Sequence, residues 1–212
     1  MPEGSEQLVL DGLRHVGVVP VVTVTDAATA PELVGALAAA GLRYVEITLR
    51  TPAALDALAA ARSAGVLGAG TVTTVRDAES VLEAGVRFVV SPGLDEGVVR
   101  ICQEAGVPVL PGVATPTEVM AARALGLRWV KVFPVAHLGG AGFVRALSSV
   151  WPDMTFLPTG GVSRDNAREY LDIPAVAAIG GSWMVPAGLV AAHDWPRIGQ
   201  LARDAAELRS FS

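Results

Sequence analysis

Short apolar runs alternate with amphipathic stretches along the whole chain. Eight apolar runs, several of them rich in valine, recur at intervals of roughly 20–25 residues, over residues 18–24, 43–49, 66–71, 86–91, 107–112, 128–133, 154–159 and 175–181. Continuous apolar runs of this length are typical of parallel strands that are buried on both faces. The pattern therefore predicts eight parallel strands.

The segments between these runs have apolar residues at helical spacing, and most of them end in glycine, which suits a helix C-cap. Four examples are residues 30–41, 51–65, 77–85 and 95–106. Regular alternation of strands and helices predicts βαβ units and a parallel sheet.

Eight such units predict a (β/α)8 TIM barrel with short loops, formed by one domain over residues 1–212. A leading helix over residues 4–15 and a helical tail over residues 188–210 complete the expected fold. The alternative is an open, doubly wound sheet. Its usual G-x-G-x-x-G phosphate motif is absent after the first predicted strand, which ends in "TVTDA".

Composition and charge limit the classes of molecule that the protein is expected to bind. The 212 residues are 51% hydrophobic and 17% charged, with a net charge of −5, which argues against nucleic acid or an anionic membrane as the main partner. Neither a signal-peptide pattern nor an apolar run of about 18 residues is present, so we expect a cytoplasmic protein. The one cysteine, Cys102, excludes an internal disulfide, and we expect it to serve core packing.

Lys131 is the only lysine among the 16 basic residues. It lies in the middle of the apolar run "RWVKVF", where an unpaired charge is costly. Arginine holds carboxylates through two hydrogen bonds and suits a structural role, whereas lysine can form a Schiff base. Apolar surroundings favour the neutral, nucleophilic amine. We expect that apolar wall to consist of Trp129, Val130, Val132 and Phe133.

Glu46 is the second charged residue inside an apolar run. Glu46 and Lys131 belong to even-numbered strands, and alternate strands share a layer of a barrel interior, so the two side chains are expected to face each other. One interpretation of the pair is a buried salt bridge that only fixes packing. The other is a catalytic pair, with Lys131 as nucleophile and Glu46 as its acid and base.

Glycine pairs follow the last two predicted strands, in "TGG" at 159–161 and "GGS" at 180–182. The corresponding loops of this fold often bind phosphate through backbone N–H groups. Tight turns that need a positive φ are the alternative explanation. Two pairs at adjacent strand ends, one followed by Ser182, favour phosphate binding.

Weaker candidates are Arg50, which follows the Glu46 strand and can clamp a carboxylate, and Thr71, which also fits a helix cap. His137 lies after the lysine strand and is a candidate proton shuttle, ahead of His15 and His193. No His, Cys, Asp or Glu cluster has metal-ligand spacing, and no G-x-S-x-G motif is present.

Together these stretches resemble the 2-keto-3-deoxy-6-phosphogluconate (KDPG) and 4-hydroxy-2-oxoglutarate (KHG) aldolases of bacteria. The likeness runs in order from about residue 16 to residue 185 and rests on "VVPVVTVTDA", "EITLRT", "GAGTVTT", "VSPGLD", "VKVFPVAHLGG", "PTGGVS" and "GGSW". Val132 and Val135 depart from the Phe and Ala that are usual in the family. We expect Val132 to point away from Lys131 and Val135 to reshape the mouth of the site.

The resemblance implies a Schiff-base lyase that acts on a phosphorylated 2-keto acid, without a metal or cofactor. Lys131 is then the nucleophile, Glu46 the general acid and base, and Arg50 and Thr71 the ligands of the pyruvate carboxylate. The far end of the substrate, with its phosphate, is implied to lie against Thr159, Gly160, Gly161, Gly181 and Ser182. Homotrimers in the Entner–Doudoroff pathway are typical of the family.

Two rival functions fit the same residues. One is an isomerase or epimerase on a phosphate-binding barrel, with Glu46 as base and Lys131 as electrophile. The other is a sugar-phosphate sensor that has the fold without the chemistry.

Overall fold

The computed structural model describes residues 5–209. Strands and helices alternate, as the apolar pattern predicts. The strands are β1 (Val18–Val22), β2 (Tyr44–Thr48), β3 (Val66–Gly70), β4 (Phe88–Val90), β5 (Val109–Leu110), β6 (Gly112–Val113), β7 (Trp129–Val132), β8 (Thr155–Pro158) and β9 (Ile179–Gly181). The helices are α1 (Ser5–Val16), α2 (Ala30–Ala39), α3 (Ala54–Ala61), α4 (Val75–Glu83), α5 (Glu96–Glu104), α6 (Pro116–Ala124), α7 (Gly140–Val150), α8 (Ala167–Leu171), α9 (Ala187–Ala191) and α10 (Trp195–Ala206).

Each predicted apolar run contains a strand. The run over residues 107–112 is divided into β5 and β6 by Pro111, which has no N–H group to donate to a neighbouring strand. The carbonyl group of Pro111 still accepts a hydrogen bond from the Lys131 N–H at 2.9 Å. The two short strands therefore continue one line through the sheet.

All strand pairs are parallel. Six strands pair in the order β5-β4-β3-β2-β1-β9, and three pair in the order β6-β7-β8. Isolated bridges between Phe156 and Val176 and between Thr159 and Gly180 join β8 to the segment of β9. Neighbours are consecutive in the chain and β1 pairs with β9, so the order lacks the reversal of a doubly wound sheet.

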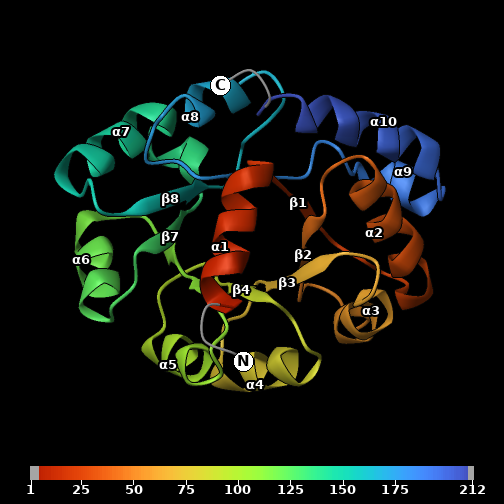
Figure 1. Ribbon diagram of the computed structural model, residues 1–212, viewed down its shortest axis with the longest axis horizontal. Helices are drawn as coiled ribbons and strands as arrows, with labels where there is room; N and C mark the ends of the chain where they lie inside the picture. The colour runs from red at the N-terminus through yellow and green to blue at the C-terminus, as the bar shows by residue number, and fades with distance from the viewer. Residues whose placement is uncertain (1–4, 210–212) are drawn as a thin grey trace.

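The strands curl, so that one face points inward and the other faces the helices that surround them (Figure 1). Outward side chains such as Val45, Ile47, Val130 and Val132 join one large core cluster with helix residues. Inward side chains near the amino ends of the strands form a second cluster, in which Phe88, Leu110, Trp129 and Leu157 take part. Alternation along each strand thus separates two apolar layers.

Helix α1 lies over the amino ends of the strands, at the centre of the view in Figure 1. Its apolar side chains Val9, Leu10 and Leu13 belong to the inner cluster, and Leu13 is fully buried. Burial of a leucine stabilises the fold by about 1.5–3 kcal/mol. The leading helix therefore covers the amino end of the curled sheet with an apolar surface.

The predicted leading helix and helical tail are both present within residues 5–209. Residue 4 of the predicted leading helix and residue 210 of the predicted tail lie outside them, and the tail consists of α9 and α10 with a break between them. Cys102 is fully buried in the outer core, which confirms its packing role, and this burial raises the pKa of its thiol to about 11. No helix within residues 5–209 is long and apolar enough to cross a membrane.

Two helical glycines differ in what surrounds them, which gives a test of the packing of α1. A Cβ at Gly12 of α1 would lie 1.7 Å from the Tyr44 hydroxyl oxygen, whereas a Cβ at Gly35 of α2 would have no neighbour within 4 Å. We expect Gly12→Ala to lower the free energy of unfolding by about 1–3 kcal/mol, because the ring of Tyr44 must move. Gly35→Ala should raise it by about 0.5–1 kcal/mol, because alanine loses less backbone entropy.

Urea denaturation of both variants measures the two changes. A stabilising effect at Gly12 equal to that at Gly35 would contradict the close packing of α1 against β2.

Candidate active site

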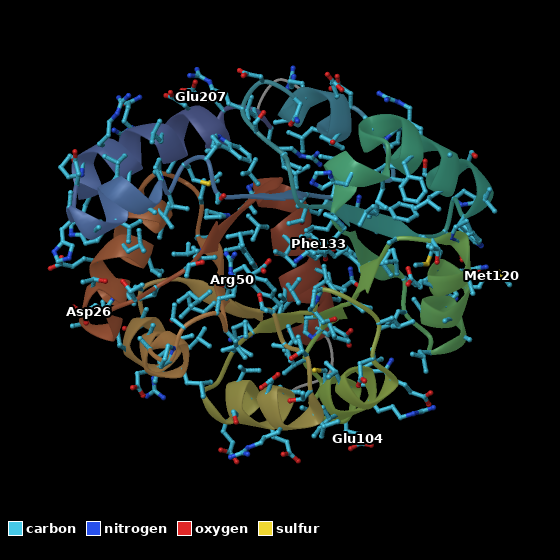
Figure 2. All side chains as sticks on the ribbon, turned by 180° about the vertical axis from the view of Figure 1, so that it is seen from behind. Asp26, Arg50, Glu104, Met120, Phe133 and Glu207 are labelled. Carbon is cyan, nitrogen blue, oxygen red and sulfur yellow. The ribbon has the colours of Figure 1, made fainter. Side chains whose placement is uncertain are left out.

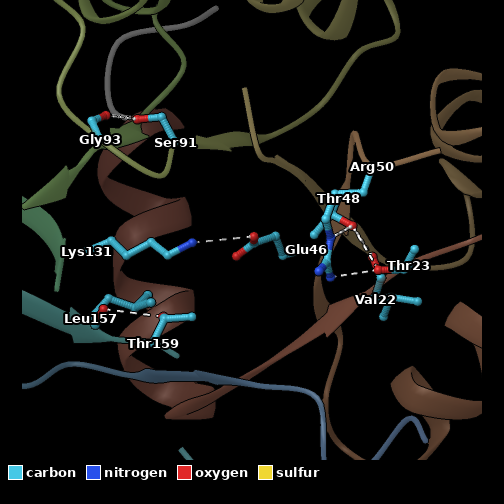
Figure 3. A network of polar contacts seen from close by, with 10 residues as sticks. All are labelled: Val22, Thr23, Glu46, Thr48, Arg50, Ser91, Gly93, Lys131, Leu157 and Thr159. Carbon is cyan, nitrogen blue, oxygen red and sulfur yellow. Dashed lines mark hydrogen bonds and ion pairs between the residues drawn. The ribbon is translucent and has the colours of Figure 1, made fainter. Parts of the chain in front are cut away.

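Lys131 and Glu46 reach toward each other across the inner face of the curled strands (Figure 3). Lys131 comes from β7 and Glu46 from β2, and their side chains are 6% and 1% exposed. The distance from Lys131 Nζ to Glu46 Oε1 is 3.9 Å. The sequence prediction that the two charges face each other is confirmed.

The separation of this pair has a chemical consequence. At 3.9 Å the two atoms form an ion pair but are too far apart for a direct hydrogen bond. The other carboxylate oxygen, Glu46 Oε2, is buried and has no hydrogen-bond partner within residues 5–209. A buried carboxylate oxygen without a partner costs about 1–3 kcal/mol or more, so this arrangement is a poor device for stability alone.

The apolar surroundings of Lys131 differ in part from the predicted wall. Phe133 shares the inward face with Lys131, and Nζ lies 4.8 Å from the centre of its ring. Trp129 also faces inward but belongs to the apolar cluster at the amino end. Val130 and Val132 face the helices instead, because side chains alternate along a strand. The prediction that Val132 points away from Lys131 is confirmed, and its inclusion in the wall is wrong.

Two glycines in β3 leave room on the inner face of the curled strands. A Cβ at Gly68 would lie 2.2 Å from the ring of Phe88, and a Cβ at Gly70 would lie 2.0 Å from Glu46 Oε1. The strand beside β2 therefore presents bare backbone where the Glu46 carboxylate lies. This space lets the Glu46 carboxylate lie across β3 as it extends toward Lys131.

Arg50 lies just beyond the carboxyl end of β2 and is labelled near the middle of the carboxyl-end view in Figure 2. Its Nε donates to Thr48 Oγ1 at 3.2 Å and its Nη2 donates to Thr23 Oγ1 at 2.7 Å. These contacts turn the guanidinium toward the same part of the curled sheet as Glu46 (Figure 3). They hold Arg50 at the carboxyl ends of β1 and β2, while its side chain stays exposed to solvent.

Thr71 directly follows β3 and has a φ of +61°. A β-branched residue is strained in this left-handed region, and such strain is found preferentially at ligand-binding positions. The alternative role of Thr71 as a helix cap is wrong, since Thr74 caps α4. Thr74 and Asp77 form a reciprocal capping box, in which the Asp77 carboxylate also accepts from the Thr73 N–H and hydroxyl groups.

The two glycine segments come together at the carboxyl ends of β8 and β9. The bridge between Thr159 and Gly180 places residues 159–161 beside residues 180–182. Gly160 and Gly161 have φ values of +90° and +82°, and a Cβ at Gly181 would lie 1.9 Å from the ring of Trp183. Backbone geometry and close packing therefore require these glycines whether or not they bind a ligand. Thr159 is buried, whereas Ser182 is exposed.

The remaining candidates lie elsewhere. Val135 is fully buried in the outer core, so its side chain does not line the mouth of the site, and its effect on the shape of the mouth stays a prediction that acts through packing. His137 is exposed on the short 3-10 helix that follows β7. Within residues 5–209, no group of three or more His, Cys, Asp and Glu side chains is suited to hold a metal ion.

Sequence reasoning missed Thr23 and Thr48, which hold Arg50. A usable signal was present, because Thr48 lies two residues from both Glu46 and Arg50 and so shares the inward face of β2. A cavity of about 680 Å³ also exists, but Asp11, Arg14, Gly41 and Arg209 line it at the amino end. We place the chemistry at the carboxyl end, because the buried ionisable pair and the strained Thr71 lie there.

The chain is similar to known proteins over most of its length. The family model described as KDPG and KHG aldolase matches residues 9–201. The 2-dehydro-3-deoxy-phosphogluconate aldolase of Treponema pallidum is 41% identical over 203 residues, which cover 94% of this chain and 97% of that protein.

Two crystal structures have nearly the same backbone. The KDPG aldolase of Legionella pneumophila, with pyruvate captured as a covalent carbinolamine intermediate, matches with a TM-score of 0.87 and 38% identity, over 91% of this chain and 96% of that chain. The 2-keto-3-deoxy-6-phosphogluconate aldolase of Zymomonas mobilis ZM4, with 3-phosphoglycerate, matches with a TM-score of 0.86 and 38% identity. The match covers 93% of this chain and 94% of that chain. This chain belongs to the KDPG and KHG aldolase family.

Proposed function

We propose that the protein is a class I aldolase. It cleaves 2-dehydro-3-deoxy-6-phosphogluconate reversibly to pyruvate and glyceraldehyde 3-phosphate, and it also accepts 4-hydroxy-2-oxoglutarate, which gives pyruvate and glyoxylate. The observation that carries this proposal is the buried Lys131 amine, 3.9 Å from a Glu46 carboxylate that has one oxygen unpaired within residues 5–209. Family membership and the pyruvate carbinolamine in the Legionella pneumophila relative support it.

Lys131 is the nucleophile in this proposal. Transfer of a proton from its ammonium group to Glu46 leaves a free amine, which attacks the C2 ketone of the substrate to form a carbinolamine. The gap between Nζ and Oε1 accommodates one bridging oxygen, which the carbinolamine hydroxyl supplies. Glu46 then protonates that hydroxyl, which departs as water and leaves an iminium ion.

Carbon–carbon cleavage follows from the charge on the iminium ion. Glu46 removes the proton of the C4 hydroxyl group, the C3–C4 bond breaks, and the electron pair of that bond neutralises the iminium as an enamine. Glyceraldehyde 3-phosphate departs, Glu46 returns its proton to C3, and water hydrolyses the new iminium to free pyruvate and Lys131. Acid–base help of this kind contributes about 10²–10⁴-fold to a rate.

The other roles follow the positions in the site. Arg50 and Thr71 bind the carboxylate of pyruvate, because they follow the paired strands β2, which holds Glu46, and β3. Thr159, Gly160, Gly161, Gly181 and Ser182 bind the phosphorylated end of the substrate, since the bridge between β8 and β9 gathers them. The 3-phosphoglycerate in the Zymomonas mobilis relative supports a ligand of this class.

We also propose that the strands form a closed (β/α)8 barrel within a single domain over residues 1–212. Three features support closure: β1 pairs with β9, β5 and β6 continue one line through Pro111, and isolated bridges link β8 to the segment of β9. An unbroken match to the family model over residues 9–201 supports a single domain.

Three broader proposals rest on the family resemblance, and a cytoplasmic location rests on the sequence pattern. The enzyme is a homotrimer that acts in the Entner–Doudoroff pathway. It works without a metal ion or another cofactor, since the iminium ion of Lys131 supplies the electron sink that the cleavage needs.

Trapping with pyruvate and borohydride tests the nucleophile. In buffer that contains EDTA, we expect a stable mass adduct on the peptide that holds Lys131, because borohydride reduces the imine to a secondary amine. Lys131→Arg keeps the charge beside Glu46 but should lower kcat/KM by at least about 10³-fold. Since Lys131 is the only lysine, the chain's α-amine is the only competing amine.

Each rival function would give a different result when the protein is assayed with the phosphorylated substrate. Isomerisation of the substrate without pyruvate release would indicate the isomerase or epimerase. Ligand-dependent melting without turnover would indicate the sensor. Near-normal activity of Lys131→Arg would show that the lysine is structural.

Ser182→Ala tests the phosphate end. We expect kcat/KM for the phosphorylated substrate to fall about 10–100-fold, because a hydrogen bond to a charged group is lost. The value for 4-hydroxy-2-oxoglutarate should stay within about twofold of wild type, since that substrate has no phosphate. An equal fall for both substrates would contradict phosphate binding by Ser182.

Gly70→Ala tests the space that Glu46 needs. The added Cβ would lie 2.0 Å from Glu46 Oε1, so the carboxylate must move away from Lys131. A displacement of about 1 Å from a reacting group costs on the order of 100-fold in rate, and we expect a loss of this size in kcat.

Gly142→Ala is the matched control, because a Cβ at that exposed position of α7 has no neighbour within 4 Å. It should retain wild-type activity. If Gly70→Ala is as active as Gly142→Ala, the position of the Glu46 carboxylate is not critical for turnover.

A further inference from the structure

Two threonine hydroxyl groups lie beneath the Arg50 guanidinium group, and neither belongs to the proposed set of substrate ligands. Thr48 is the last residue of β2 and is 2% exposed, while Thr23 follows β1 and is half-buried. The strand register explains their meeting. Val21 pairs with Glu46, so Thr23 and Thr48, two residues further along each strand, lie side by side on the inward face.

The hydrogen-bond directions in this cluster can be assigned. Thr48 Oγ1 donates its single hydrogen to the Val22 carbonyl oxygen at 3.0 Å. In the 3.1 Å contact between the two hydroxyl groups, Thr23 must therefore be the donor. Thr48 Oγ1 also accepts from Arg50 Nε at 3.2 Å, so its donor and both acceptor positions are in use.

Thr23 completes the arrangement. Its oxygen accepts from Arg50 Nη2 at 2.7 Å, while its hydrogen points to Thr48. The sequence of contacts from Arg50 through Thr23 and Thr48 ends on a backbone carbonyl group of β1, which the sheet holds in place (Figure 3). The orientation of Arg50 is thus coupled to the curled sheet rather than to a mobile side chain.

Within residues 5–209, the contacts leave a defined part of the guanidinium group without a hydrogen-bond partner. Nε and Nη2 present one edge of the planar group, and the two threonines occupy one N–H on each. Of the five N–H donors, the two on Nη1 and one on Nη2 remain, and these form the fork at the end of the side chain. A carboxylate that meets this fork accepts two parallel hydrogen bonds.

We infer that Thr23 and Thr48 are positioning residues, which hold Arg50 so that only its Nη1/Nη2 fork meets the substrate carboxylate. They make the site selective for 2-keto acids over ketones that lack a carboxylate. This inference rests on the proposed function, in which Arg50 binds the carboxylate of pyruvate. Thr48 has no hydrogen-bonding capacity left for substrate, so its effect passes through Arg50.

Thr48→Val tests the inference, because it removes the hydroxyl group and preserves the branched shape. The rate of borohydride trapping on the Lys131 peptide is measured against the concentration of pyruvate, and separately of acetone, a ketone without a carboxylate. We expect the half-saturating concentration of pyruvate to rise about tenfold, the size of effect of one hydrogen bond to a charged group. The maximal trapping rate with pyruvate and the whole profile with acetone should stay within about twofold of wild type.

Three further variants separate positioning from general damage. Thr48→Ser restores the hydroxyl group and should restore the pyruvate profile. Thr23→Val removes the partner of Nη2 and should raise the half-saturating concentration in the same direction. Thr51→Val is the matched control, because the Thr51 hydroxyl group donates to the Val24 carbonyl oxygen and, within residues 5–209, forms no hydrogen bond with the Arg50 side chain, so it should leave both profiles unchanged.

Certain results would overturn the inference. One is an unchanged pyruvate profile in Thr48→Val. Another is a rise in the half-saturating concentration of acetone equal to that of pyruvate. A third is failure of Thr48→Ser to restore the half-saturating concentration of pyruvate. If the wild-type protein traps neither ketone on Lys131, the proposed function fails instead.

If the wild-type protein traps neither ketone, the effect of the two threonines on Arg50 is measured by NMR, which needs no catalysis. The NMR signal of the Arg50 Nε–H group is assigned by its loss in Arg50→Lys. It should exchange slowly with solvent in the wild type and at least tenfold faster in Thr48→Val. Equal exchange rates would show that the threonines do not hold Arg50.

Discussion

The ion pair between Lys131 and Glu46 is the constraint around which the rest of the inner face is arranged. Two charges that are almost fully buried lose most of their hydration, and a separation of 3.9 Å returns only part of that cost. Well-packed apolar residues of similar size would often stabilise the fold more. A site that keeps the pair with one carboxylate oxygen unpaired within residues 5–209 is better explained by chemistry than by stability.

Several neighbouring features exist because of this pair. Gly70 leaves bare backbone where the Glu46 carboxylate lies, and Phe133 lies against the Lys131 amine. Below the pair, α1 and the inner apolar cluster fill the amino end of the curled sheet, so the charges face the carboxyl end. The apolar layer below and the polar loops above thus give the curled sheet one reactive end.

The loops at that end are short, and contacts between residues a few positions apart in the chain hold them in place. Asp77 accepts from the backbone and side chain of Thr73 just after the strained Thr71, and Glu118 makes similar contacts with the N–H groups of Ala114 and Thr115 at the start of α6. Each carboxylate ties a loop to the first turn of the next helix. Short loops that are tied in this way can hold the proposed substrate-binding residues in fixed positions.

The sequence by itself determined the strand and helix order, the parallel arrangement and the two charged residues that meet. These features follow from local periodicity and from the high cost of an unpaired charge in an apolar strand, and both can be seen in single segments such as "RWVKVF". Strand parity likewise placed Val132 on the face opposite Lys131. Only the tertiary structure decided that Trp129 packs in the apolar cluster at the amino end and that Val135 belongs to the core. It also brought Thr23 and Thr48 under Arg50. The meeting of Thr23 with Thr48 depends on the register between strands that are about 25 residues apart in the chain, and no local pattern carries that register.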